Sequence, residues 1–198
     1  MTRTGSAERS TQESRITVTL DLDGSGTSKV STGIPFFDHL LEQLGRHSLM
    51  DLEVSADGDV QVDEHHTVED CGIVIGRALD SALGERAGIR RYGDVRIPMD
   101  EALATCAIDL GGRAYSIITP RPDPFAGTSP WLDLVPHFLE SLAREARMTL
   151  HLDVAGAASV HHHAEAAMKA FARALRAASE LDPRLDTAAV PSTKGSIG

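Results

Sequence analysis

The segment His39-Leu40-Leu41-Glu42-Gln43-Leu44 returns 98 positions later as His137-Phe138-Leu139-Glu140-Ser141-Leu142. The alignment runs on without a gap to Asp51-Leu52-Glu53-Val54 and its counterpart Thr149-Leu150-His151-Leu152. A pattern that returns at a fixed spacing is the sequence signature of a repeated structural unit. The repeat therefore predicts a chain built from two similar halves.

A second pair of motifs follows these segments, His65-His66-Thr67-Val68-Glu69 and His161-His162-His163-Ala164-Glu165. Their offset is 96 residues because the preceding connection is two residues shorter in the second half, and loop length is what duplicated domains vary most easily. On a helix, residues four apart share a face, so the first His and the Glu of each motif can bind one cation. The second His, His66 or His162, is turned by about 100° and points toward a different neighbour.

Each half thus supplies one lone His, one His-His pair and one Glu. These nitrogen and oxygen donors, without thiolate, suit a catalytic divalent ion such as Mn, Fe or Zn. The candidate metal ligands are His39, His65, His66, Glu69, His137, His161, His162 and Glu165. Three histidines have no metal-site counterpart in the repeat: His47, His151 and His163. The roles of His151 and His163 stay open.

Composition and charge restrict the classes of function. The chain has 198 residues, enough for one core or two small ones, and a formal net charge of −10. An acidic protein is a poor partner for nucleic acid, whose phosphates require a basic surface. The opening residues are polar, no apolar run could span a bilayer, and two cysteines are too few for a disulfide framework. We therefore expect a cytoplasmic protein with no nucleic-acid or membrane partner.

Cations are scarce in this acidic chain, and three segments place one beside glycine or a hydroxyl. They are Ile89-Arg90-Arg91-Tyr92-Gly93, Gly111-Gly112-Arg113-Ala114-Tyr115 and Pro191-Ser192-Thr193-Lys194-Gly195-Ser196. Such combinations are typical of small phosphate sites. For the last segment the residues alone favour a solvated, frayed terminus.

Periodicity predicts the elements of the first half. After a polar leader of about a dozen residues, apolar and polar residues alternate over 16–22, as in a strand with one buried face. Asp23-Gly24-Ser25-Gly26 predicts a hairpin turn into a second strand. Pro35 opens a helix, because proline suits the first helical turn. A strand, a turn, a short strand and a helix are then predicted at 49–54, 57–59, 60–62 and 64–84.

The second half repeats this order. Two hairpin strands around Gly111-Gly112, a helix, a strand and a last helix are predicted at 102–110, 114–119, 131–145, 148–154 and 160–180. Strand pairs that alternate with helices imply an α+β fold, in which each half is a small sheet covered on one face by two helices. We place the halves at 1–93 and 94–198, packed as one compact unit. Strand order, and whether a metal site is completed within one chain or between chains, stay open.

Together these segments resemble the imidazoleglycerol-phosphate dehydratase family of histidine biosynthesis. The resemblance covers nearly the whole chain and rests on the order and spacing of motifs at 22–26, 31–39, 58–59, 65–70, 137–138, 161–171 and 191–195. It implies two manganese ions per active site, held by the eight ligands above, although other divalent ions fit the same donors. It also implies a homo-oligomer of 24 subunits with active sites at subunit contacts.

The resemblance implies a hydro-lyase that converts imidazoleglycerol phosphate, a small-molecule substrate, into imidazole acetol phosphate. The substrate loses a hydroxyl from the carbon beside the ring and a proton from the next carbon, which no carbonyl activates. Metals on both ring nitrogens would stabilise an imidazolate that expels the hydroxyl and gives a diazafulvene-like intermediate. The implied catalytic residues are Glu13, His39, His65, Glu69, His161 and Glu165. The implied substrate-binding residues are Glu13, Gln43, His47, Arg91, Arg113, Lys169, Ser192 and Lys194.

Helix geometry suggests how the two ions would be divided. One ion would be bound by His65 and Glu69, and the other by His161 and Glu165, so that the second His of each motif crosses over. The acid/base carboxylate of the family corresponds to Glu13, which the residues alone would place in a solvated leader.

Two other functions use the same donor set. A dimetal phosphohydrolase would also bind a small phosphate ester, but such sites usually rely on Asp-rich ligands, and this set is rich in imidazole. A non-enzymatic metal-binding or assembly protein would leave the arginines and Lys194 without an anion to hold.

Overall fold

The computed structural model describes residues 3–120, 129–156, 158–186 and 188–197. The first sheet has the strand order β1-β2-β4-β3, and only β3 runs parallel to its neighbour. Its strands are β1 (Thr4–Ser10), β2 (Ser14–Asp21), β3 (Ser28–Ser31) and β4 (Asp51–Gly58). Helices α1 (Pro35–Ser48) and α2 (His65–Leu83) cover one face of this sheet.

The second sheet repeats this topology in the order β5-β6-β8-β7, again with one parallel pair, β7 with β8. Its strands are β5 (Tyr92–Met99), β6 (Ala102–Asp109), β7 (Tyr115–Thr119) and β8 (Thr149–Ala155). Helices α3 (Trp131–Glu145) and α4 (Val160–Ser179) cover one face of it. The predicted α+β class with two similar halves is confirmed, and the division at residue 93 stays a prediction.

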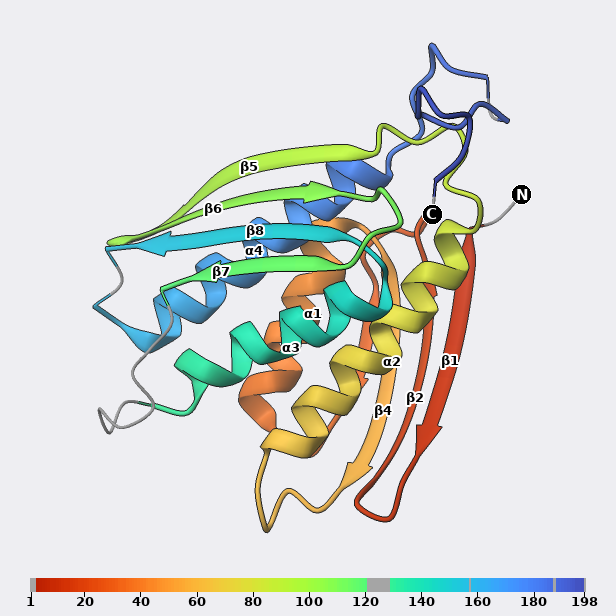
Figure 1. The fold of residues 1–198 in the computed structure, drawn as a ribbon. Coiled ribbons are helices and arrows are strands. Elements are labelled where there is room, and N and C mark those ends of the chain that lie inside the picture. Colours follow the sequence, from red (N-terminus) through yellow and green to blue (C-terminus); the bar gives the residue numbers. More distant parts are fainter. Residues whose placement is uncertain (1–2, 121–128, 157, 187, 198) are drawn as a thin grey trace.

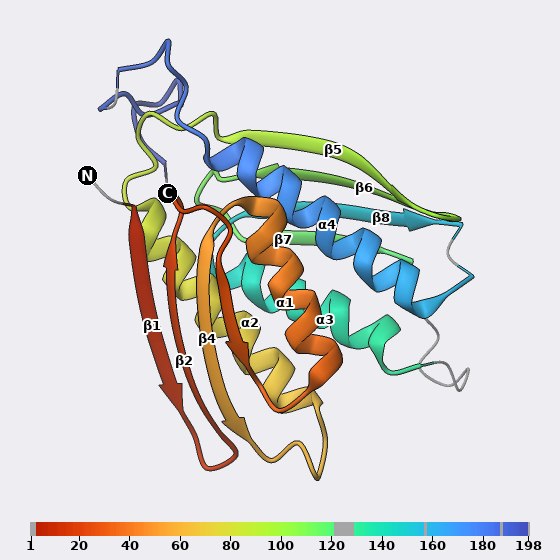
Figure 2. The ribbon, with the colours of Figure 1, turned by 180° about the vertical axis from the view of Figure 1, so that it is seen from behind.

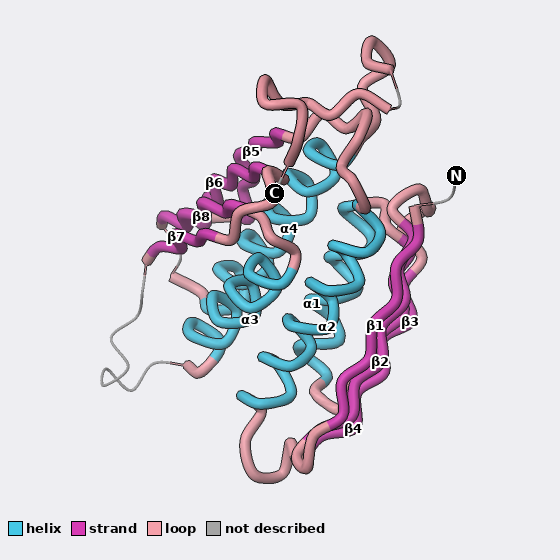
Figure 3. Tube along the Cα trace, turned by 45° about the vertical axis from the view of Figure 1, so that its right-hand side comes forward, coloured by secondary structure: helices cyan, strands magenta, loops and turns pink. Residues whose placement is uncertain are grey.

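The four helices lie between the two sheets (Figures 1 and 3). α2 packs along α3, and α1 packs along α4, so both helix pairs join one half to the other. Figure 2 shows the pair α1 and α4 from behind. Gly72 and Gly76 of α2 allow this helix to approach α3 closely. A Cβ at Gly72 would lie 2.6 Å from the carbonyl oxygen of Phe138, and a Cβ at Gly76 would lie 2.5 Å from the carbonyl oxygen of Leu142. The halves consequently share one hydrophobic core.

Local sequence accounts for most of these elements. Ile16, Val18 and Leu20 point into the core, as the alternation along β2 predicts. Pro35 stands in the first turn of α1, and the apolar stripe of this helix is buried. Helix α2 begins at His65 and ends before Gly84, and α3 spans 131–145, as predicted.

The polar leader predicted for the first dozen residues is wrong, because residues 4–10 form β1 and pair with β2. Polar side chains cover most of this edge strand, so no apolar alternation reveals it. The repeat extends into it nevertheless. A Cβ at Gly5 would lie 2.0 Å from the Ala78 carbonyl oxygen, and a Cβ at Gly93, the equivalent position of β5, would lie 2.2 Å from that of Ala174.

Both predicted hairpin turns are also wrong. β4 lies between β2 and β3, and β8 lies between β6 and β7, so the glycine-rich turns at 23–26 and 111–112 connect strands that do not pair. Turn residues report local backbone geometry, whereas pairing depends on where the strand after the next helix returns. The turn at 57–59 and the strand at 60–62 are corrected too, because β4 continues to Gly58 and a turn follows it. Among the described residues, no helix has the length and apolar character to span a bilayer.

Candidate active site

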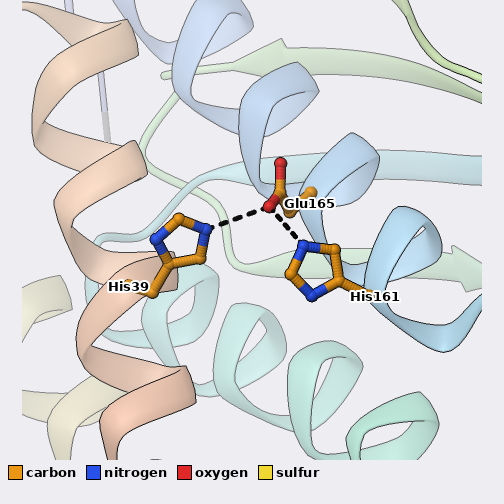
Figure 4. Close-up of side chains that lie close together, drawn as sticks. All are labelled: His39, His161 and Glu165. Carbon is orange, nitrogen blue, oxygen red and sulfur yellow. Dashed lines mark hydrogen bonds and ion pairs between the residues drawn. The ribbon is translucent and has the colours of Figure 1, made fainter.

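The first group of metal-ligand candidates joins α1 to α4. The Nε2 atom of His39 lies 2.9 Å from Oε1 of Glu165, and Nε2 of His161 lies 2.7 Å from the same oxygen. Figure 4 shows both rings directed at this carboxylate, one from each helix. The three ligand atoms lie within 4.8 Å of one another, so one cation could replace the protons that they now share.

Glu165 is buried, yet the groups around it lower the pKa of its carboxyl. Burial by itself would raise the pKa of its carboxyl, but hydrogen bonds from Lys169 and His39 outweigh burial and lower the pKa to about 2. Lys169 Nζ donates to Oε2 at 2.5 Å, and Gln43 Nε2 lies 2.8 Å from the ring nitrogen of His39. The sequence-predicted substrate residues Gln43 and Lys169 therefore lie beside this group of ligands.

The second group joins α2 to α3. The rings of His65 and His137 stack with centroids 4.5 Å apart, and Nε2 of His137 lies 3.5 Å from Oε2 of Glu69. Among the described residues, that buried Nε2 atom has no hydrogen-bond partner. A buried ring nitrogen without a partner costs free energy unless a ligand uses its lone pair. This orphaned atom fits a site for a divalent cation.

Each group therefore combines donors from both halves of the repeat. A lone His of one half meets the His and the Glu of the motif from the other half. The motif spacing predicts the pairing of the first His of each motif with its own Glu, whereas no local pattern in the sequence places the lone histidines.

The second His of each motif lies outside both groups, against a carboxylate of a hairpin turn. Nδ1 of His66 is 3.6 Å from Oε2 of Glu13, which precedes β2. Nδ1 of His162 is 2.7 Å from Oε2 of Glu101, which precedes β6. The hydrogen bond from His162 lowers the pKa of Glu101 to about 2, and the same bond raises the pKa of His162. Sequence reasoning missed Glu101, although it is the counterpart of Glu13 in the repeat.

Four of the predicted substrate residues line one pocket of about 730 Å³ at the C-terminal end of the chain: Arg91, Arg113, Ser192 and Lys194. The guanidinium of Arg91 donates to both carboxylate oxygens of Asp109, at 2.7 and 3.1 Å, and to the Pro191 carbonyl at 2.8 Å. Arg91 thus fixes the tail against the second sheet. A charged pocket of this kind suits a phosphate.

This pocket and the first ligand group lie at opposite ends of α4. The backbone N–H of Arg91 donates to the Ala178 carbonyl in the last turn of the helix, whereas Glu165 lies near its start. Glu165 and Ala178 are thirteen positions apart on the helix, which is about 20 Å at 1.5 Å per residue. One chain therefore does not bring the phosphate pocket to this ligand group.

Of the remaining histidines, His47 is part of α1, His163 is part of α4, and His151 lies on a strand of the second sheet. Burial and the charges of Lys169 and Arg173 lower the pKa of His47. His163 is buried, which lowers its pKa, and His151 is exposed on β8.

The family model of imidazoleglycerol-phosphate dehydratase matches residues 32–175. This chain belongs to the imidazoleglycerol-phosphate dehydratase family. It is 52% identical to the imidazoleglycerol-phosphate dehydratase of Corynebacterium urealyticum over 199 aligned residues, which cover 98% of this chain and 97% of that protein. It is 50% identical to that of Nocardia farcinica, with 98% and 96% covered.

Solved structures agree with this assignment. The crystal structure of imidazoleglycerol-phosphate dehydratase from Staphylococcus aureus has a TM-score of 0.78 and 33% identity, and covers 90% of this chain and 99% of that one. The structure from Pyrococcus furiosus, in complex with (S)-C348, has a TM-score of 0.78 and 31% identity, with 96% and 99% covered. The chain is therefore a hydro-lyase that dehydrates imidazoleglycerol phosphate in histidine biosynthesis.

Proposed function

We propose that this dehydratase requires two divalent cations per active site and that manganese is the resident metal. The observation that carries the proposal is the pair of three-donor groups, each with two imidazoles and one carboxylate on packed helices. Nitrogen and oxygen donors without thiolate fit Mn²⁺ and leave coordination positions for a substrate. His66 and His162 supply the remaining donors, which makes eight protein ligands for two ions.

These sites are completed between chains of a homo-oligomer, for which the family resemblance implies 24 subunits. His66 and His162 belong to neither of the two imidazole-rich groups, and His162 stands instead with Asp100 and Glu101. We infer that a neighbouring chain brings its own ligand group to each of these two rings. The phosphate pocket lies about 20 Å along α4 from Glu165. The three-carbon linker between the imidazole ring and the phosphate of the substrate is too short to span this distance. A neighbouring protein chain must therefore supply either the ligand group or the phosphate pocket.

When bound, the cations supply positive charge that stabilises the deprotonated imidazole ring of the substrate. Loss of the hydroxyl beside this electron-rich ring then gives a diazafulvene-like intermediate. Glu13 removes the proton from the next carbon, and the enol becomes imidazole acetol phosphate. Glu13 is suited to this role because its carboxylate is half exposed and lies 3.6 Å from the ligand His66.

The phosphate of the substrate is held by Arg91, Arg113, Ser192 and Lys194. Three other substrate-binding residues lie beside the metal ligands and are Gln43, His47 and Lys169. Arg91 also orders the tail through the Pro191 carbonyl, which brings Ser192 and Lys194 to the pocket. Charge-assisted bonds from several donors give both affinity and orientation. We place the reaction in the cytoplasm, in keeping with two unpaired, buried cysteines, Cys71 and Cys106.

The family assignment favours dehydration over the phosphohydrolase and the non-enzymatic alternatives. The test is conversion of imidazoleglycerol phosphate by metal-stripped enzyme, with and without added Mn²⁺, following the ketone product. We expect ketone only when Mn²⁺ is present. Full activity of the stripped enzyme would contradict the metal requirement, and release of inorganic phosphate in place of ketone would favour the phosphohydrolase.

A further inference from the structure

Glu101 uses its two carboxylate oxygens for two different tasks. Oε1 accepts the backbone N–H groups of Ala158, at 3.1 Å, and Ser159, at 2.9 Å, which lead into α4. Oε2 lies 2.7 Å from Nδ1 of His162, in the first turn of that helix. The side chain is therefore fixed at both oxygens although it stands in an exposed hairpin turn.

The internal repeat makes Glu101 the equivalent of Glu13. Ile16 pairs with Ala56 in the first sheet, and Ala104 pairs with Val154 at the equivalent place in the second sheet. Glu13 lies three positions before Ile16, and Glu101 lies three positions before Ala104. Each glutamate also faces Nδ1 of the second His in the adjacent motif. The distance is 3.6 Å in the first half and 2.7 Å in the second, so the two equivalent carboxylates are held differently.

We propose that Glu101 is a positioning residue for the metal ligand His162. Its carboxylate accepts a hydrogen bond from the Nδ1–H group of the ring, which keeps the proton on Nδ1 and leaves Nε2 as the atom that binds the cation. Metal-bound histidines commonly donate their other ring N–H to a carboxylate, which fixes the tautomer and the ring orientation. This inference rests on the proposed metal dependence. The two equivalent glutamates then have different roles: Glu13 takes part in proton transfer, and Glu101 orients a metal ligand.

The second ring nitrogen of His162 faces an exposed carboxylate. Nε2 of His162 faces Asp100, whose Oδ2 lies 3.5 Å away and whose side chain is 74% exposed. This distance is too long for a hydrogen bond, and Asp100 can turn toward solvent when a cation arrives.

Glu101→Gln separates the tautomer effect from the support of the helix end. The two backbone N–H groups require an oxygen, so the Gln amide oxygen takes the place of Oε1 and its NH₂ group faces His162. Nδ1 must then accept a hydrogen bond, and the ring proton moves to Nε2, where it competes with the cation. The fold is kept while the ligand tautomer is disfavoured.

Ser159→Ala is the matched structural control. Ser159 Oγ accepts the backbone N–H of His162 at 3.3 Å and caps α4, so its loss loosens the same helix end without changing the contact at Nδ1. Glu85→Gln, in the exposed turn after α2, controls for the change of charge.

The experiment is titration of metal-free, full-length protein with Mn²⁺, in which free Mn²⁺ is measured by electron paramagnetic resonance. We expect Glu101→Gln to weaken one class of Mn²⁺ site by about 10- to 100-fold, and Ser159→Ala and Glu85→Gln to bind like the unmodified protein. Equal weakening in Ser159→Ala, or no weakening in Glu101→Gln, would overturn the proposal. Equal weakening in Asp100→Asn would mean that the carboxylates bind the cation themselves, which also overturns it. Failure of the unmodified protein to bind Mn²⁺ would refute the metal dependence, separately and before any variant is compared.

Discussion

His39 and Glu165 stand 126 positions apart in the chain, yet the imidazole Nε2 of the first lies 2.9 Å from the carboxylate Oε1 of the second. The two residues come from different halves of an internal repeat and meet where α1 packs on α4. The mirror arrangement, His137 with Glu69, forms where α3 packs on α2. Each of these two groups takes donors from both halves, so the duplicated halves depend on each other for these groups as well as for the core.

Removal of one ring from each group tests the assignment of the ligands. We expect His65→Ala, and separately His39→Ala, to lower bound manganese from two ions per chain to about one, because each group loses one of its donors. Metal content is measured by mass spectrometry of reconstituted, desalted protein. His151→Ala, on the surface of β8, is the control. An unchanged metal content in His65→Ala would show that the ring is not a ligand.

Glu13→Gln tests the proton-transfer role. The amide cannot take up a proton, so we expect kcat to fall by about 10²- to 10⁴-fold, the usual range for general acid–base catalysis. Bound metal should stay at the level of the unmodified enzyme, because Glu13 lies beside a ligand and is not one. Ketone formation in a steady-state assay and metal content on the same sample are the two measurements. Full activity would remove Glu13 from the mechanism.

Lys194→Ala tests the phosphate pocket. One charge-assisted hydrogen bond contributes about 1.5–3 kcal/mol, so we expect KM for imidazoleglycerol phosphate to rise by about 10- to 100-fold. Metal content should not change, because Lys194 belongs to none of the candidate ligand groups. Lys29→Ala, on the first sheet, is the control for loss of a lysine. A KM equal to that of the unmodified enzyme would place the phosphate elsewhere.

Gly5→Ala and Gly93→Ala test the extension of the repeat into the first hairpin of each half. A methyl group at either position meets a carbonyl oxygen of the covering helix at 2.0 or 2.2 Å, so strand and helix must move apart. We expect each variant to lose about 1–3 kcal/mol of stability, by similar amounts, in thermal unfolding followed by circular dichroism. Ser6→Ala, exposed beside Gly5, should unfold like the unmodified protein. A stable Gly93→Ala variant would mean that the second hairpin tolerates a wider spacing.

The ligand types and the duplicated plan could be read from the sequence because both depend on local spacing. Residues four apart on a helix share a face wherever the helix lies, so His161 and Glu165 could be paired before the fold was known. Helix bounds such as His65 to Leu83 followed from apolar periodicity and terminal signals. Strand β1 was missed because its buried side is a glycine and an alanine, which leave no apolar alternation.

Relationships between segments required the tertiary structure. The turn at 23–26 has hairpin residues, yet the strand that pairs with β2 arrives only after α1, and no local signal encodes that return. In the same way, nothing near His39 indicates that its partner is Glu165. The sequence by itself determined which donors exist and which elements carry them. Packing of α1 on α4 and of α2 on α3 decided which donors meet, because the faces that contact are chosen by the shared core of both halves.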